Sequence, residues 1–153
     1  MEQKREGDFR KGIFFVVYHL EDRNPKFLIQ KRKLHWKGYE FPKGGIESGE
    51  FEEECVKREI FEETGLNIKK LKNHHLSGKY LYRKALKDRP NVIGQTWKLY
   101  SAEVGKGNVE IDPKEHSSYE WLNYEDARKK LTWNNQKNCL DIVWDWINRK
   151  SLK

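Results

Sequence analysis

Three glutamates, Glu59, Glu62 and Glu63, crowd into five consecutive positions of a segment without Gly or Pro. This segment, residues 51–64, is rich in Glu, Lys and Arg, which is typical of a helix. At about 100° per residue, Glu62 and Glu63 lie on either side of Glu59, so the three carboxylates share one helix face. Such like charges repel, and a divalent cation among them would relieve the repulsion; oxygen ligands favour Mg²⁺, Mn²⁺ or Ca²⁺. The alternative is a solvated acidic face, as for Glu52–Glu54 just upstream.

The residues around these glutamates follow a longer pattern. Residues 44–66 fit G-x5-E-x7-R-E-U-x-E-E-x-G-U, in which U is apolar, at every position. Seven fixed identities, each at a usage of roughly 7%, would match by chance on the order of 10⁻⁸ per window. The pattern resembles the Nudix box, the signature of the Nudix hydrolases. The resemblance implies an α/β fold, namely the Nudix-type α/β/α sandwich with a mixed β-sheet and a loop-helix-loop catalytic box at 44–66. It also implies a pyrophosphohydrolase that uses Mg²⁺ or Mn²⁺ and acts on a nucleoside diphosphate linked to another group.

The resemblance gives each matched residue a role. Glu59, Glu62 and Glu63 would bind the metal ions and serve catalysis. Glu50 would be structural and would pair with Arg58 to hold the loop against the helix.

The small residues of the box also receive roles from the resemblance. Gly44 and Gly45 would let the backbone turn sharply and approach the phosphates of the substrate. The carbonyl of Lys43 matches a position that often contacts metal in the family. Gly65 stands where a helix C-cap glycine belongs. Cys55 projects near the carboxylate face, and we interpret it as a small packing residue; the alternative is a thiolate ligand.

Three segments outside the box resemble one branch of the family, the diadenosine tetraphosphate hydrolases and the related RNA 5′-pyrophosphohydrolases. They are Trp36 with 41–45, 93–95 with Lys98, and 115–122 with 131–133. In this resemblance Glu115 matches a loop carboxylate that helps to bind metal or acts as a base; the alternative is an ordinary loop glutamate. His116 is a competing base, and its alternative is a structural or merely polar role.

Several side chains are candidates for binding the substrate. Lys43, Arg32 and Lys98 are candidates for gripping phosphates beyond the cleaved bond, and a solvated surface position is the alternative for each. Tyr80 and Tyr82 could stack on a base, which is worth roughly 1–3 kcal/mol, or they could simply pack on a strand. The basic turn that follows them could steer phosphates; it contains Arg83, Lys84, Lys87 and Arg89.

The resemblance to this branch of the family implies an asymmetric bis(5′-nucleosyl)-tetraphosphatase, which cuts a dinucleoside tetraphosphate into NTP and NMP with metal-activated water. One alternative is an RNA 5′-pyrophosphohydrolase that acts on triphosphorylated RNA ends, which the net charge of +7 and the match at 93–95 favour. An alternative of another class is a non-catalytic nucleotide- or RNA-binding module with the same fold. Such a module could dispense with the metal carboxylates, which this chain keeps.

The carboxylate helix needs a sheet to position it, and the rest of the chain supplies strand and helix signals. Alternating or continuous apolar runs predict strands, and apolar residues in a helical stripe predict the last helix. We expect strands at 13–20, 27–32, 76–83, 92–104 and 119–122, and helices at 51–64, 124–131 and 135–149.

Composition sets the limits around these elements. The 153 residues predict a single domain over 1–153, and six Trp, seven Tyr and seven Phe are too many for a disordered chain. The net charge of +7 favours polyanionic partners such as nucleotides or RNA. Cys55 and Cys139 form no disulfide framework, and the charged start Met1–Lys11 leads into no secretory segment. We therefore expect a cytoplasmic protein with no membrane association and no obligate protein partner.

Overall fold

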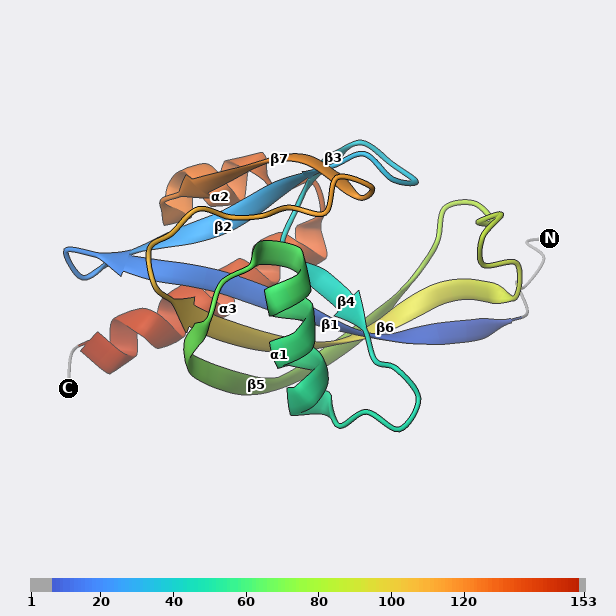
Figure 1. Ribbon diagram of the computed structural model, residues 1–153, viewed down its shortest axis with the longest axis horizontal. Helices are drawn as coiled ribbons and strands as arrows, with labels where there is room; N and C mark the ends of the chain where they lie inside the picture. Colours follow the sequence, from blue (N-terminus) through green and yellow to red (C-terminus); the bar gives the residue numbers. More distant parts are fainter. Residues whose placement is uncertain (1–6, 152–153) are drawn as a thin grey trace.

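A mixed β-sheet with helices on both faces supports the carboxylate helix (Figure 1). This computed structural model describes residues 7–151, except the side chains of residues 150 and 151. The ends of the predicted domain, residues 1–6 and 152–153, therefore lie outside the described residues, as do the first six positions of the charged start. The elements are β1 (Asp8–Glu21), β2 (Asn24–Arg32), β3 (Gly38–Glu40), β4 (Lys43–Gly45), α1 (Glu52–Thr64), β5 (Ile68–Leu81), β6 (Val92–Val104), β7 (His116–Leu122), α2 (Tyr124–Lys130) and α3 (Asn134–Ser151).

The sheet places β1 at its centre and anchors the box to it. The strand order is β3-β2-β1-β6-β5, with β4 paired to β1 and β7 paired to β2. Strands β1 and β6 are parallel, and β1 with β2 forms the hairpin that the sequence predicts. In the β1–β4 pair, Ile13 lies opposite Gly44 and Phe14 lies opposite Lys43. The backbone just before α1 is thus fixed by hydrogen bonds to the middle of the sheet.

Two hydrophobic cores lie on the two faces of the sheet, and β1 contributes to both. Phe14, Val16 and Tyr18 pack on the face covered by α2 and α3, whereas alternate residues such as Ile13 and Phe15 pack on the face covered by α1. Because both faces are covered, the strand is a continuous apolar run instead of an alternating one. The predicted α/β/α sandwich is confirmed.

The C-terminus of α1 and the N-terminus of α2 each have a capping residue. Gly65 follows α1 with a left-handed φ of 70°, and its N–H donates to the carbonyl of Phe61. Glycine adopts this conformation without the steric cost that a Cβ brings. Asn123 precedes α2, and its side-chain oxygen accepts from the N–H of Asp126. The C-cap predicted at Gly65 is confirmed, and Asn123 is the N-cap of α2.

One predicted strand has a different start in the structure, and two strands were missed. Strand β5 begins at Ile68, not at residue 76, because a bulge between Asn73 and Ser77 shifts the alternation and hides its first half. Strands β3 and β4 were not predicted at all. Each has three residues and contains glycine, so it exists only through pairing with β2 or β1.

The two cysteines lie in different cores. Cys55 packs on the α1 side and Cys139 on the α3 side, and both are free thiols. Burial, the main cause in both cases, raises the pKa of each thiol to about 12. Cys55 is therefore a neutral packing residue, and its Sγ lies 3.5 Å from the carbonyl oxygen of Gly45.

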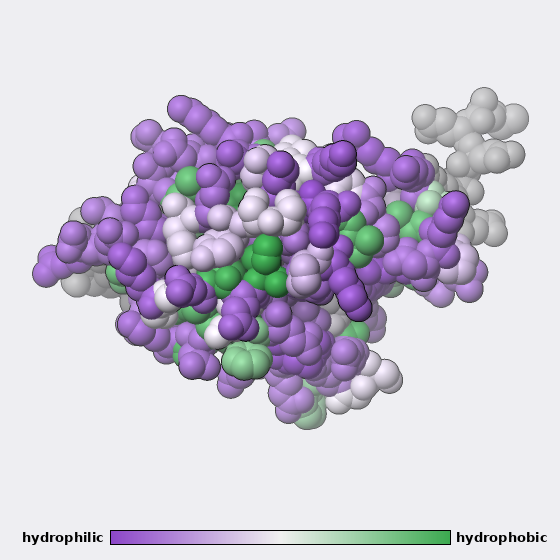
Figure 2. All heavy atoms as spheres, turned by 45° about the horizontal axis from the view of Figure 1, so that its top comes forward, coloured by the Kyte–Doolittle hydropathy of each residue, from purple (hydrophilic) through white to green (hydrophobic). Residues whose placement is uncertain are grey.

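The outer surface is mostly hydrophilic, as Figure 2 shows for one face; the most strongly apolar group lies near the middle of that view, and smaller ones are scattered around it. Over residues 7–151, no helix has the combination of length and apolar character that spanning a membrane requires.

Candidate active site

The three glutamates of α1 differ in their exposure. Glu59 and Glu63 are buried, whereas the side chain of Glu62 is 56% exposed. All three line one cleft, so the shared helix face that the sequence predicts is directed into a cavity. Burial raises the pKa of Glu59, even though the adjacent Arg58 opposes the shift. The helix therefore holds carboxylates that lack the hydration that normally stabilises their charge.

Arg58 joins the loop, the helix and two of the carboxylates. Its Nε and Nη2 donate to the two carboxylate oxygens of Glu50 at 2.6 and 2.9 Å. Nη2 also donates to the carbonyl of Gly45, and Nη1 donates to Glu59 at 2.8 Å and Glu62 at 3.0 Å. Such a fork fixes the orientation of each carboxylate as well as its position.

Gly44 lies directly under Glu59. A Cβ on Gly44 would lie 2.2–2.5 Å from the carboxyl end of Glu59, which is closer than atoms can approach. The glycine is thus required by the position of the carboxylate and not by an unusual φ.

This contact leads to a prediction for Gly44→Ala. The added methyl group must displace the Glu59 carboxylate, and displacement of a catalytic group by about 1 Å costs roughly 10²-fold in rate. We expect kcat to fall by about that factor while the urea midpoint changes little. Gly105→Ala is the control, because its Cβ would meet only Lys69 at 3.5 Å. Equal kcat values for the two variants would show that Glu59 does not need its observed position.

A second cluster approaches α1 from the start of β7. The Nε2 of His116 lies 2.8 Å from Glu40, and its Nδ1 lies 3.6 Å from Oε2 of Glu63. Glu115 also contributes to this cluster, and the carbonyl of Glu115 accepts from the N–H groups of Lys33 and Leu34, which fixes the loop. Burial first, and then the charge of Glu115, raises the pKa of Glu63.

The buried carboxylate of Glu40 organises the cations beside the cleft. It is fully buried, and its oxygens lie 3.1 Å from Nη1 of Arg32 and 3.2 Å from Nζ of Lys43. Burial would raise the pKa of Glu40, but Lys43, His116 and Arg32 outweigh it and lower the pKa. Burial likewise works against the charge of Lys43, yet Glu40 and Tyr80 hold its pKa above the usual value. Both groups are therefore charged at neutral pH.

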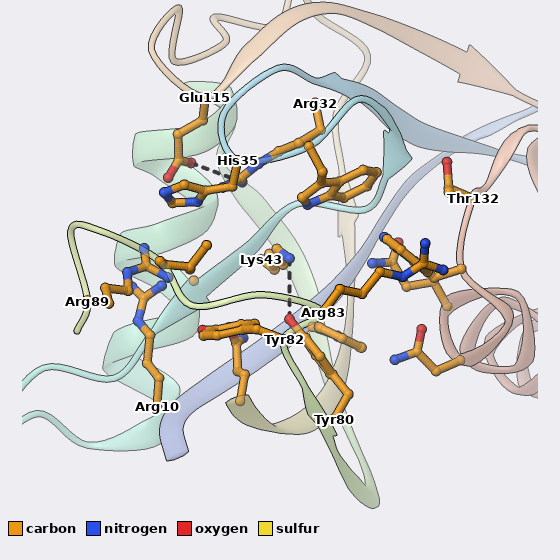
Figure 3. Close-up of a pocket in the computed structure, with 18 of the residues that line it drawn as sticks. Arg10, Arg32, His35, Lys43, Tyr80, Tyr82, Arg83, Arg89, Glu115 and Thr132 are labelled. Atoms are coloured by element: carbon orange, nitrogen blue, oxygen red, sulfur yellow. Dashed lines mark hydrogen bonds and ion pairs between the residues drawn. The ribbon is translucent and has the colours of Figure 1, made fainter. Parts of the chain in front are cut away.

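The cleft in front of these groups has a volume of about 1120 Å³ and is lined mainly by cations and aromatic rings. In Figure 3, Lys43 lies at its centre, with Arg32, His35 and Glu115 on one side and Tyr80 and Tyr82 on the other. The cationic lining residues are Arg10, Arg32, Lys37, Lys43, Arg83, Lys84 and Arg89. The aromatic lining residues are Phe14, Trp36, Tyr80, Tyr82 and Trp133.

The aromatic rings form two groups that face Lys43. Tyr80 and Tyr82 are 6.1 Å apart at their ring centroids, and Trp36 and Trp133 are 5.2 Å apart. Nζ of Lys43 lies 5.9 Å from the ring centroids of both Trp36 and Tyr80. The guanidinium of Arg83 lies 4.7 Å from the ring of Trp133 and so joins the basic turn to the far wall. A cation between aromatic walls is a suitable receptor for a base joined to phosphates.

The other residues predicted to bind the substrate are either occupied by protein contacts or lie outside the cleft. Arg32 lines the cleft, but it is buried and donates to Glu40 and to the carbonyl of Leu34. Lys98 is a correction, because it does not line the cleft. Strand alternation directs its neighbour Trp97 to the cleft side, and Nζ of Lys98 pairs with Glu52 at 2.8 Å. Within the basic turn, Lys87 does not line the cleft, unlike its three companions.

The sequence analysis overlooked Arg10 and Glu40. Arg10 lines the cleft from β1, and its guanidinium packs on the backbone of Gly45, where a Cβ would clash with it. In the part of the chain that the structure describes, it forms no ion pair. Arg10 and Phe14 are an even number of residues apart on one strand and therefore lie on the same face of it, so strand alternation could have indicated the position of Arg10. The contact of Glu40 with His116 depends on a partner 76 residues away, so no local signal marks it.

The acidic groups fit a divalent cation. Oε2 of Glu63 is buried and has no hydrogen-bond partner among the described residues. Glu59, Glu62, Glu63 and Glu115 all line the same cleft and present oxygen donors, which Mg²⁺ and Mn²⁺ prefer. A metal ion would compensate the repulsion between Glu63 and Glu115, which otherwise raises the pKa of Glu63.

Known proteins resemble this chain in sequence and in fold. The NUDIX domain signature matches residues 10–141. The RNA pyrophosphohydrolase of Escherichia coli (strain K12 / DH10B) is 30% identical over 127 residues, which cover 76% of this chain and 70% of that protein.

Solved structures show the same architecture. A complex of the Caenorhabditis elegans Ap4A hydrolase matches with a TM-score of 0.73 and 20% identity, and the match covers 91% of this chain and 98% of that chain. A NUDIX hydrolase from Listeria monocytogenes matches with a TM-score of 0.76 and 20% identity over 94% and 96% of the two chains. The Escherichia coli dihydroneopterin triphosphate pyrophosphohydrolase gives 0.71 and 18% over 87% and 94%. At these identities the likeness concerns the fold alone.

Proposed function

Because the chain belongs to the NUDIX family of hydrolases, we propose that it cleaves a dinucleoside tetraphosphate asymmetrically, to a nucleoside triphosphate and a nucleoside monophosphate. One observation carries this proposal: the α1 carboxylates open into a cleft whose other walls are cationic and aromatic. A substrate with several phosphates and a base at each end matches such a lining in charge and in shape.

The residues divide the work between metal and substrate. Glu59, Glu62, Glu63 and Glu115 would hold Mg²⁺ or Mn²⁺, together with the carbonyl of Lys43. When bound, the metal supplies charge neutralisation and an activated water, which is the chemistry that phosphoanhydride hydrolysis needs. Arg58 orients two of the carboxylates through hydrogen bonds of 2.8 and 3.0 Å.

The cations and rings of the cleft would bind the substrate. The ammonium of Lys43 and the guanidinium of Arg10 would grip the phosphates on either side of the cleaved bond, near Gly45. Tyr80 and Tyr82 would stack on one base, while Trp36 and Trp133 provide a second apolar wall. The volume of about 1120 Å³ is slightly above the usual range for small-ligand sites, which suits a ligand with two nucleosides.

Product analysis tests this proposal. Protein incubated with diadenosine tetraphosphate and Mg²⁺ in ¹⁸O-water, followed by ion-exchange chromatography, is expected to give equal ATP and AMP. The label should appear in only one of them and so identify the phosphorus that is attacked. Production of ADP alone, or no turnover by folded protein, would contradict asymmetric cleavage.

A second candidate is removal of phosphates from triphosphorylated RNA ends. It is favoured by the basic turn at the cleft mouth, where Arg83, Lys84 and Arg89 line the cavity, and by the activity named for the Escherichia coli relative. On this alternative, kcat/KM rises with the length of the RNA and falls steeply with salt, because each phosphate contact releases counterions. On the primary proposal, diadenosine tetraphosphate has the higher kcat/KM.

The cytoplasmic location expected from the sequence stays a prediction.

Arg10 provides a prediction that separates cleft from surface cations. A hydrogen bond from a charged donor to phosphate contributes about 1.5–3 kcal/mol, so Arg10→Ala should lower kcat/KM by roughly tenfold or more. Lys98→Ala is the matched control, because Lys98 does not line the cleft, and it should change kcat/KM less than about twofold. Steady-state kinetics on diadenosine tetraphosphate measures both. A larger loss in the Lys98 variant would reverse our assignment of the two residues.

A further inference from the structure

His116 is a buried histidine held between two carboxylates. It is 1% exposed, and its two ring nitrogens face different partners. Nε2 lies 2.8 Å from Oε2 of Glu40, whereas Nδ1 lies 3.6 Å from Oε2 of Glu63. A ring in this position is fixed in orientation, because both ends meet buried oxygen atoms.

The surroundings of Glu40 decide which nitrogen carries a proton. Arg32 and Lys43 lie 3.1 and 3.2 Å from the Glu40 oxygens, so this carboxylate stays ionised and can only accept hydrogen bonds. Nε2 of His116 must therefore be the donor. In the neutral ring this leaves a lone pair on Nδ1, which is directed toward Glu63.

The space between His116 and Glu63 brings two unpaired acceptor atoms together, and a metal ion there would satisfy both. Nδ1 of His116 and Oε2 of Glu63 are both buried, and neither has a hydrogen-bond partner among the described residues. Leaving such atoms unsatisfied is unfavourable, because neither regains the hydrogen bonds that it makes in water. Glu115 adds a third donor, since one ligand atom of each of Glu63, Glu115 and His116 lies within 4.8 Å of the others.

We propose that Glu63, Glu115 and His116 form a divalent-metal site in which Nδ1 of His116 is a ligand. The site rests on the proposed function, because Glu63 belongs to the same metal-binding helix face, but it adds a nitrogen donor to an otherwise all-oxygen set. Imidazole suits later transition metals such as Zn²⁺ better than Mg²⁺, so the chain should bind Zn²⁺ more tightly than Mg²⁺.

The geometry suits such an ion. Ligand atoms at about 2.0–2.2 Å from one metal lie at most about 4.4 Å apart, so a small rotation of a side chain completes the site. Glu115 can make that rotation, because its side chain is 25% exposed. Glu40 completes the arrangement from behind: a metal-binding histidine usually donates its other N–H to a carboxylate, which fixes the tautomer and orients the ring.

Pulsed EPR of the full chain with Mn²⁺ alone tests the site. Electron spin echo modulation from ¹⁴N is expected in the wild-type spectrum, and uniform ¹⁵N-histidine labelling should replace it with the ¹⁵N pattern. His116→Gln should abolish the modulation and raise the Kd for Mn²⁺ by roughly 10–100-fold. Glutamine still offers an N–H toward Glu40, and urea unfolding verifies that the variant folds. His35→Gln, which removes another histidine of the cleft, should leave the modulation unchanged.

Two results would overturn the site. Absence of nitrogen modulation in the wild-type Mn²⁺ complex means that His116 does not bind the metal; this result needs no variant. Modulation that persists in folded His116→Gln means that another histidine is the ligand. Either result can occur alongside Mg²⁺-dependent hydrolysis, whereas failure of the proposed function appears as absent turnover with an unchanged Mn²⁺ spectrum.

Discussion

Replacement of Glu62 by Gln is expected to lower kcat by on the order of 10³-fold, equivalent to about 4 kcal/mol of transition-state stabilisation, while the fold stays intact. Glu62 lines the cleft, and its carboxylate is the most exposed of the three on α1. An amide keeps the size of the side chain but removes the negative charge that would hold the metal. Because the side chain is 56% exposed and pairs with Arg58 within one helix, its removal costs little stability.

A matched control separates catalysis from general helix effects. Glu54→Gln makes the same change on the same helix, but Glu54 is exposed and does not line the cleft. Its kcat should equal that of the wild type. Steady-state kinetics at saturating Mg²⁺ measures both variants, and circular dichroism verifies the fold. A kcat of Glu62→Gln within tenfold of the wild type would remove this residue from the metal site.

Replacement of Glu40 by Gln is expected to have the largest effect on stability. The variant should lose about 3–5 kcal/mol of unfolding free energy, because the fully buried carboxylate is the shared counter-ion of Arg32 and Lys43. Without it, Lys43 loses its carboxylate partner among the described residues, and Arg32 keeps only the more distant Glu115, at 3.8 Å. His116 also loses its charged acceptor, so the ring that faces Glu63 becomes less fixed.

Urea unfolding at pH 7 measures this loss. Glu120→Gln is the control, since Glu120 pairs with Lys130 at 3.3 Å on the surface and its side chain is 46% exposed. Exposed pairs contribute little, so the control should unfold at the wild-type midpoint. If Glu40→Gln also unfolds at that midpoint, the buried cations are stabilised by something other than Glu40.

Much of the fold was accessible from local sequence signals. The apolar runs of β1 and β2 and the glycine after α1 each predict their element from neighbouring residues, and each is confirmed. Short strands such as β3 and β4 could not be found in this way, because three residues have no measurable period and their pairing partners lie elsewhere. The single domain over 1–153 and the roles of the box residues stay predictions.

The residues of the site also differ in whether local sequence signals predict their position. The carboxylates of α1 are close in sequence, so helical spacing alone brings them together. Glu40 and His116 are 76 residues apart, and only the pairing of β2 with both β3 and β7 places them in contact. Lys98 was correctly predicted to lie on a strand, but its side chain was wrongly expected to reach the substrate. Alternate residues of a strand point to opposite faces, and Lys98 points away from the cleft, toward Glu52.

The most direct test of the central claim is the metal dependence of turnover on diadenosine tetraphosphate. Protein treated with EDTA should be inactive, and Mg²⁺ or Mn²⁺ should restore the release of ATP and AMP in equal amounts. Hydrolysis that continues unchanged in EDTA, or folded protein that stays inactive after either metal is added, would contradict a metal-dependent tetraphosphatase built on the glutamates of α1.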